Sequence, residues 1–266
     1  GFSMGNVGGM NYNGNTYVGW GWKANGASRT TFTESGNNPG GGHQANTTAG
    51  FSIVDYVGTG GAGTVAHGLG AVPHWIMVKN RDTAQTWAVY HIKNTDDPET
   101  DILQLEATNA TYDGNTYWND TAPTTSVFSI GTANNTGAAQ TYVAYCFAEK
   151  KGFSKIGSYT GNANADGAFI YTGFKPAFVL IKQSSASGED WNIYDNKRNT
   201  FNATDKVLFP NLTNAEATKT GGMDFLSNGI KMRGTDGAFN TSQTYIYMAF
   251  ASEPLVSSNG IPATAS

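Results

Sequence analysis

The sequence predicts an all-β protein of two tandem β-sandwich units, jelly-roll-like in their strands, preceded by the leftover β-hairpin of a third unit. Short apolar runs rich in aromatic and β-branched residues are bounded by Gly, Asn, Pro and Thr, which is typical of buried strands. Glycine is abundant, with 34 in 266 residues, as expected for many tight turns. Long segments also recur at a spacing of 102 to 104 residues.

The clearest repeat is a hairpin that occurs three times, at residues 2–24, 128–149 and 230–253. Each copy has a short apolar strand, a turn region and then a longer apolar strand that opens with Thr-Tyr-(Val/Ile). The aligned residues are Tyr17 with Tyr142 and Tyr245, and Trp22 with Phe147 and Phe250. These positions predict equivalent strands in three places along the chain.

Two of the copies have matching residues upstream of the hairpin. Pro73 aligns with Pro176, Lys79 with Lys182, and residues 86–91 with residues 190–195. The predicted organisation is a terminal hairpin at 1–25, a Gly/Asn-rich linker at 26–49, β-sandwich units at 50–150 and 151–254, and a tail at 255–266. A chain that starts within a unit is expected to be a piece of a longer tandem array.

The strand at residues 142–148 predicts a sheet with two apolar faces. Tyr142, Ala144, Cys146 and Ala148 should face one way, and Val143, Tyr145 and Phe147 the other. The two full units are joined almost directly through residues 149–152, so we expect them to pack as a rigid pair.

Composition excludes several classes of protein. The net charge is −4 and no basic patch is visible, so a nucleic-acid partner is not expected. A single cysteine, Cys146, excludes a disulfide scaffold and a thiolate zinc site. No run of 18 apolar residues is present, so membrane insertion is not expected. The four histidines lack metal-ligand spacing, and we expect no metal, cofactor or catalytic residue.

The strongest candidate for ligand binding is the run Tyr117, Trp118, Asn119 and Asp120. Aromatic rings can stack on the apolar face of a sugar while amide and carboxylate groups bind its hydroxyls. Alternatively, Trp118 caps the sandwich core and the two polar residues begin a turn before Pro123. Tyr12, Trp75 and Tyr112 are weaker candidates of the same kind.

Glycoside hydrolysis would need two carboxyl groups held at a fixed separation. Acidic residues cluster at 96–101, which includes Asp96, Asp97, Glu99 and Asp101, and again at Glu189 and Asp190. Both clusters adjoin Pro or Gly and are typical of solvated turns. We therefore predict a protein that is not an enzyme, with a polysaccharide depolymerase as the second alternative.

Several strings resemble repeated β-domains of tailed-bacteriophage virion proteins, which occur in fibre-like proteins of phages of marine bacteria and cyanobacteria. They include GFSIVDYVGTG at 50–60, AHGLGAVPHWIMVKNR at 66–81, TYVAYCFAE at 141–149 and AFIYTGFKPAFVLIK at 168–182. The resemblance covers nearly the whole chain and is weakest over residues 26–48. It brings no catalytic motif with it.

The resemblance implies a structural component of the virion, most simply a tail-fibre or adhesin segment that contacts a host-surface glycan or protein. A capsid decoration or fibre-assembly module without a receptor role is the first alternative. The implied partners are other virion proteins and further copies of the chain, arranged as a homotrimer, and the implied location is the virion.

Overall fold

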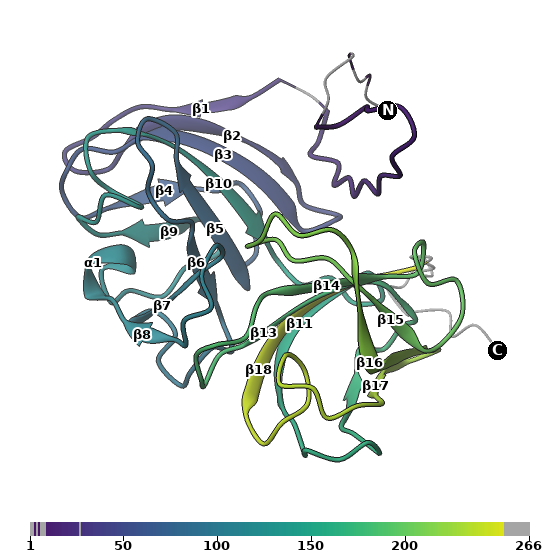
Figure 1. Ribbon diagram of the computed structural model, residues 1–266. Helices are drawn as coiled ribbons and strands as arrows, with labels where there is room; N and C mark the ends of the chain where they lie inside the picture. The colour runs from purple at the N-terminus through teal and green to yellow at the C-terminus, as the bar shows by residue number, and fades with distance from the viewer. Residues whose placement is uncertain (1–2, 4, 6–8, 27, 253–266) are drawn as a thin grey trace.

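The computed structural model describes residues 3, 5, 9–26 and 28–252. Within them the chain forms many antiparallel strands and one short helix, α1 (Asn115–Trp118). The all-β class predicted from the sequence is confirmed, and the stacked antiparallel sheets agree with a β-sandwich (Figure 1). The predicted tail at 255–266 lies outside the described residues.

The first half of the molecule is an eight-stranded sheet with two additional strands over it (Figure 1). In spatial order the sheet contains β1 (Thr30–Phe32), β2 (Gly40–Asn46), β3 (Phe51–Val57), β10 (Thr141–Phe147), β5 (Trp75–Asn80), β6 (Ala88–His91), β7 (Asp101–Gln104) and β8 (Tyr112–Asp113). The additional pair is β4 (Gly63–Ala66) with β9 (Val127–Ile130).

The second half contains two four-stranded sheets (Figure 1). The first has the order β11 (Ser154–Thr160), β18 (Thr244–Ala251), β13 (Pro176–Gln183) and β14 (Asn192–Asp195). The second has the order β12 (Phe169–Tyr171), β17 (Gly229–Met232), β16 (Ala217–Leu226) and β15 (Thr204–Val207).

The two halves share one strand order. In β3-β10-β5-β6 the last strand of the first half, β10, lies between β3 and β5, and in β11-β18-β13-β14 the last strand of the second half, β18, lies between β11 and β13. Tyr142 stacks on Tyr56 with ring centroids 5.0 Å apart, and Tyr245 stacks on Tyr159 at 5.1 Å. Tyr142 and Tyr245 are aligned positions of the repeated hairpin, while the number of repeats and their boundaries stay predictions.

Each half has its own core, and a third apolar cluster lies between the halves. The first core contains Tyr142, Ala144 and Cys146 from one face of β10. The opposite face contributes Tyr145 and Phe147 to the cluster between the halves, as the alternation of this strand predicts. Both faces of β10 therefore contact apolar clusters, which accounts for the near-continuous apolar run in its sequence.

The interpretation of residues 26–49 as a linker is wrong, because this stretch contains β1 and β2 of the large sheet. Its glycines are typical of a flexible connection, but those at the start of β2 lie in a strand packed against its neighbours. A Cβ on Gly41 would lie 2.1 Å from the carbonyl oxygen of Asp55, so only glycine fits at this position.

The hairpin predicted at residues 1–25 is not formed among the described part of that range, since residues 9–26 contain no strand. Part of its first strand falls outside the described residues. Its second strand corresponds to residues 16–24, which we call the N-terminal segment. A strand requires hydrogen-bonded neighbours, and here the segment instead places Trp20, Trp22 and Ala24 against the cluster between the halves.

Candidate functional site

The predicted ligand-binding run lies on α1 and the turn that follows it. The helix ends because Asn119 adopts a left-handed conformation with φ of 53°, and Asp120 follows with φ of 43°. Asn and Asp tolerate this region better than other non-glycine residues. The four residues are therefore divided by the end of the helix, with the two rings on one side and the two polar groups on the other.

Trp118 caps the core of the first half, as the alternative interpretation of this run expected. Its side chain is 2% exposed, its Nε1 donates to the carbonyl oxygen of Asp101 at 3.1 Å, and its edge contacts Tyr90. Tyr117 is half-buried, with its hydroxyl 3.2 Å from that of Tyr112. The indole of Trp118 is therefore not available to stack on a sugar.

Asn119 and Asp120 are exposed and line a shallow polar hollow of about 250 Å³. Its other lining residues are Asn115, Thr116, Gly131 and Thr132. Carboxylate, amide and hydroxyl groups together can accept and donate hydrogen bonds to the hydroxyls of a ligand. We call this the polar hollow; it contains two of the four residues predicted from the sequence.

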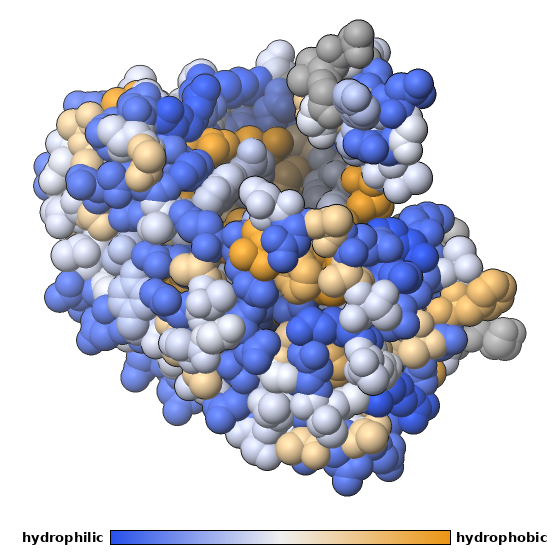
Figure 2. All heavy atoms as spheres, viewed as in Figure 1, coloured by the Kyte–Doolittle hydropathy of each residue, from blue (hydrophilic) through white to orange (hydrophobic). Residues whose placement is uncertain are grey.

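A larger, apolar hollow of about 540 Å³ lies between the two halves, and Figure 2 shows hydrophobic atoms there in orange. We call it the aromatic groove. Its aromatic lining residues are Trp20, Trp22, Phe51, Trp87, Tyr145, Phe147 and Phe178. The Nζ of Lys79 lies 5.9 Å from the centre of the Trp87 ring, within the range of a cation–π contact.

The sequence comparison did not single out the aromatic groove as a site. It had aligned Trp22 and Phe147 with Phe250 and had placed Tyr145 on the same strand face as Phe147, and all four residues belong to the cluster between the halves. The alignment of these aromatic positions was the available signal. The alignment does not indicate which two sheets face each other.

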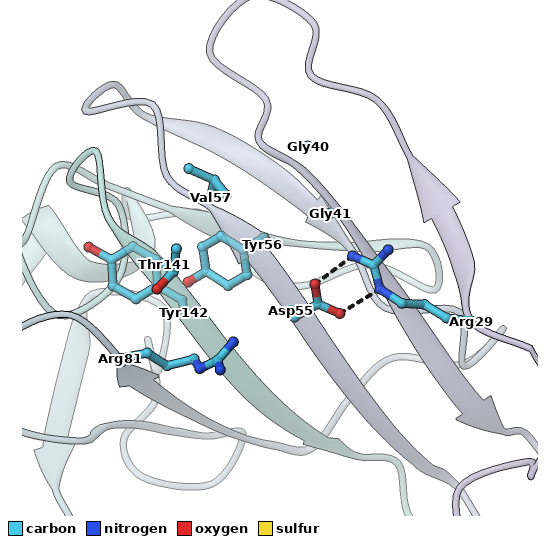
Figure 3. A pocket seen from close by; sticks show the side chains of 9 residues that line it. All are labelled: Arg29, Gly40, Gly41, Asp55, Tyr56, Val57, Arg81, Thr141 and Tyr142. Atoms are coloured by element: carbon cyan, nitrogen blue, oxygen red, sulfur yellow. Dashed lines mark hydrogen bonds and ion pairs between the residues drawn. The ribbon is translucent and has the colours of Figure 1, made fainter.

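A third hollow, of about 330 Å³, lies at the end of the large sheet where β2 and β10 begin and β3 ends (Figure 3). Arg29 holds Asp55 through two hydrogen bonds, the Nε bond being 2.7 Å, and Arg81 lies across the hollow beside Thr141. The ion pair satisfies the charge of Asp55, and it raises the pKa of Arg29 through the hydrogen bond to Asp55. Of the three charged residues that line this hollow, Arg81 is the one outside the ion pair, so it is the charged group left for a ligand.

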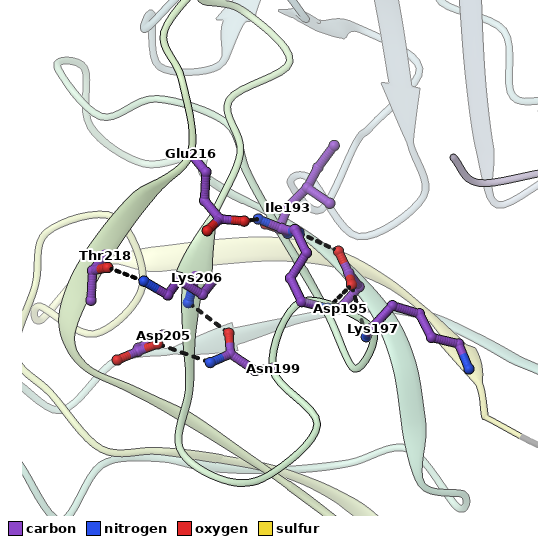
Figure 4. A network of polar contacts seen from close by, with 9 residues as sticks. Ile193, Asp195, Lys197, Asn199, Asp205, Lys206, Glu216 and Thr218 are labelled. Atoms are coloured by element: carbon purple, nitrogen blue, oxygen red, sulfur yellow. Dashed lines mark hydrogen bonds and ion pairs between the residues drawn. The ribbon is translucent and has the colours of Figure 1, made fainter. Parts of the chain in front are cut away.

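A polar network in the second half is built around a buried carboxylate (Figure 4). Asp195 is 1% exposed and accepts hydrogen bonds from the Nε of Arg198 at 2.6 Å and from the backbone N–H of Lys197 at 2.9 Å. Arg198 also donates to the carbonyl oxygen of Ile193 at 2.9 Å. Every contact of Asp195 is internal, so this network supports the fold.

The acidic residues that could have served a depolymerase are held in separate local contacts. Asp101 accepts a hydrogen bond from Thr95, and Asp190 accepts one from Asn211 at 2.6 Å. Within the described residues, no group of His, Cys, Asp and Glu side chains is placed to hold a metal ion.

A family model described as a domain of unknown function (DUF7483) matches residues 1–254. The chain belongs to this family. The match runs without interruption through the N-terminal segment, β1, β2 and both halves. No curated protein and no solved structure matches the chain significantly. Among the described residues, no helix has the length and apolarity needed to cross a membrane.

Proposed function

We propose that this DUF7483 protein is a structural component of a tailed-bacteriophage virion, a fibre or adhesin segment that contacts a glycan or protein on the host surface. It works by binding, without turnover. The resemblance of its repeated strings to phage β-domains supports the virion part of this proposal. The supporting structural observation is the interface between the two halves.

That interface joins the two halves through buried aromatic rings and hydrogen bonds. Trp75 and Trp191 are fully buried with ring centroids 5.9 Å apart, and the Nε1 of Trp191 donates to the carbonyl oxygen of Gln104 at 2.9 Å. Thr111 donates to the carbonyl oxygen of Ser184 at 2.9 Å in the same region. Aromatic contacts and hydrogen bonds between the two halves are suited to a fibre module that must resist bending.

The polar hollow beside α1 is the part of this scaffold we assign to the host ligand. Asn119 and Asp120 are exposed there and held by the turn that ends the helix. Amide and carboxylate groups that are already held in place can form hydrogen bonds to sugar hydroxyls with little loss of side-chain conformational entropy. The depolymerase stays the second alternative; the contacts of Asp101 and Asp190 with Thr95 and Asn211 do not favour it over binding.

Immunogold microscopy tests the location. Antibody against the 266-residue chain, applied to particles of the phage that encodes it, should label the tail or its fibres. Labelling spread over the capsid lattice would favour the decoration role, and particles without label would contradict a virion protein.

Binding is tested with the labelled chain and intact host cells or purified surface polysaccharide. Saturable binding without shortening of the polysaccharide is the expected result. Absence of binding in every assembly state would contradict the adhesin role, and shortened chains would contradict a role without turnover. The homotrimer implied by the resemblance stays a prediction, which mass measurement in solution checks.

A further inference from the structure

Three aligned aromatic residues meet at one point of the molecule. The ring centroid of Trp22 lies 6.0 Å from that of Phe147 and 5.4 Å from that of Phe250, and Phe147 and Phe250 are 6.0 Å apart. Phe147 ends β10 and Phe250 lies near the end of β18, which are the central strands of the two halves. Trp22 is at the same aligned position of the N-terminal segment. The three sequence copies therefore converge about one common point.

The N-terminal segment also has the burial pattern of a central strand that lacks its own sheet. Val18, Trp20 and Trp22 are partly buried, whereas the residues between them are exposed. In β10 and β18 the positions equivalent to Tyr17 are Tyr142 and Tyr245, which are fully buried in the cores. Tyr17 is 47% exposed. The strand face that forms a core in both halves is therefore exposed to solvent at Tyr17 in the third copy.

The local turn before the tyrosine is nevertheless formed. The backbone N–H of Tyr12 donates to the hydroxyl of Tyr17 at 2.9 Å. In the second half, the backbone N–H of Thr241 donates to the hydroxyl of Tyr245 at the same distance. The hydroxyl of Tyr17 thus accepts a backbone hydrogen bond as that of Tyr245 does, whereas Tyr245 is also buried, stacks on Tyr159 and donates to the carbonyl oxygen of Gly237.

Open space lies on both sides of the N-terminal segment. One side is the aromatic groove; the other is a hollow of about 450 Å³ that includes Phe153, Phe178 and Phe250. In the complete halves these two sides are taken by strands: β3 and β5 flank β10, and β11 and β13 flank β18. The two hollows therefore lie where the neighbouring strands of a third sheet would be.

Two residues of the second half contact the first half, whereas the contacts of their aligned counterparts lie within the first half, from Lys79 to the carbonyl oxygen of Gln85 and from Trp87 to the ring of Tyr145. Trp191 packs on Trp75 and Lys182 donates to the carbonyl oxygen of Thr108, both in the first half. Their aligned counterparts are Trp87, which lines the aromatic groove, and Lys79, which lies over its ring. If the halves follow one another around a common point, a third unit would cover Trp87 and Lys79 as the first half covers Trp191 and Lys182.

We propose that the aromatic groove and the hollow on the other side of the N-terminal segment hold a third β-unit of this same fold. Residues 16–24 form its central strand, and the three units make a ring around Trp22, Phe147 and Phe250. The central strand comes last in each complete half, so this proposal requires the remaining strands of the third unit to lie upstream of residue 16. The distance from Phe51 to Tyr142, and from Ser154 to Tyr245, is 91 residues, so the unit needs a similar length upstream. This assembly is independent of the host-binding role.

Hydrogen exchange on the full natural polypeptide and on the 266-residue chain tests the proposal. In the full polypeptide, the amides of residues 16–24 should exchange at least tenfold more slowly, as expected when strands pair on both sides. The 266-residue chain should bind an apolar dye such as ANS at the groove, and the full polypeptide should not. Trp87→Ala should reduce dye binding, whereas Phe201→Ala, at an 85% exposed position outside the groove, serves as the control.

Three results would overturn the proposal. The natural polypeptide could lack a β-unit of this length directly before residue 16. Its residues 16–24 could exchange as fast as those of the 266-residue chain. Protection in the 266-residue chain that rises with its concentration would show that a second copy covers the groove instead.

Discussion

Lys182 joins the two halves, because its Nζ lies 3.3 Å from the carbonyl oxygen of Thr108, to which it donates. It also donates to the carbonyl oxygen of Glu189 at 2.9 Å, and its side chain is fully buried. Burial lowers the pKa of Lys182 to about 8. Burial of the charged ammonium therefore lowers the free energy of unfolding at neutral pH, although its hydrogen bonds connect the two segments.

The first prediction is that stability gains from the loss of this charge at alkaline pH. The folded pKa is about 8 and the usual value is 10.5, so between these values the unfolded chain binds the extra proton. The free energy of unfolding should therefore rise with pH through this window, by at most ~1.4 kcal/mol per pH unit. Urea unfolding at pH 7 to 10 measures it as the difference between the wild type and Lys182→Met, so that the titration of tyrosines cancels.

Lys79→Met is the matched control, since it removes the aligned lysine of the first half, which is only partly buried. It should leave the alkaline rise in place. Parallel pH curves for the wild type and Lys182→Met would show that Lys182 does not titrate in this window.

The second prediction concerns acid. Burial lowers the pKa of His91 to about 3; its Nδ1 accepts from the backbone N–H of Lys93 at 3.0 Å, and its Nε2 lies 3.4 Å from the carbonyl oxygen of Tyr247. The ring is neutral in the fold, so the stability it contributes is present above pH 6.5 and is lost as the pH falls towards 3. His91→Gln should reduce the acid slope of the unfolding free energy by up to ~1.4 kcal/mol per pH unit.

The slope should not vanish in this variant, because burial also lowers the pKa values of His67 and His74. Thermal melts between pH 7 and 4 follow the change. An acid slope equal to that of the wild type would mean that His91 is protonated in the folded protein.

The third prediction compares a buried ion pair with an exposed one. Arg198→Met leaves Asp195 buried with only backbone donors and should cost about 3 kcal/mol of unfolding free energy. Arg29→Met breaks the pair with Asp55, where both side chains are more than 40% exposed, and should cost much less. Urea midpoints with unchanged m-values measure both; equal losses would contradict the ranking by burial.

Alternation along single strands could be predicted from the sequence, and contacts between distant strands could not. The opposite faces of Tyr142 and Phe147 follow from the two-residue period of a strand. The contact between Trp75 and Trp191 depends on which of several apolar sheet faces meet, and a local pattern does not contain this choice.

The errors have local causes. Gly41 suggested a flexible linker, because close approach of backbone in a sheet and freedom in a loop select the same residue. The same limit applies at the candidate site, where the ligand-binding role stays a prediction. An aromatic residue beside two polar residues is equally compatible with a binding surface and with a core cap followed by a turn. In the structure α1 ends at Asn119, so Trp118 lies in the core and the two polar residues lie in the exposed turn.

The last prediction separates these two roles. Trp118→Phe removes the donor to the carbonyl oxygen of Asp101 and should cost ~1–3 kcal/mol of stability, with host-surface binding by the folded fraction unchanged. Asp120→Asn removes a charge from the polar hollow and keeps a residue that tolerates its φ of 43°, so stability should stay within ~0.5 kcal/mol while binding weakens several-fold. Asp113→Asn, the same change at an exposed position on β8, controls for net charge. Titration of the labelled variants on host cells, beside urea unfolding, gives both readouts. Equal binding by the Asp120 and Asp113 variants would exclude the polar hollow as the ligand site and leave the adhesin role to another surface.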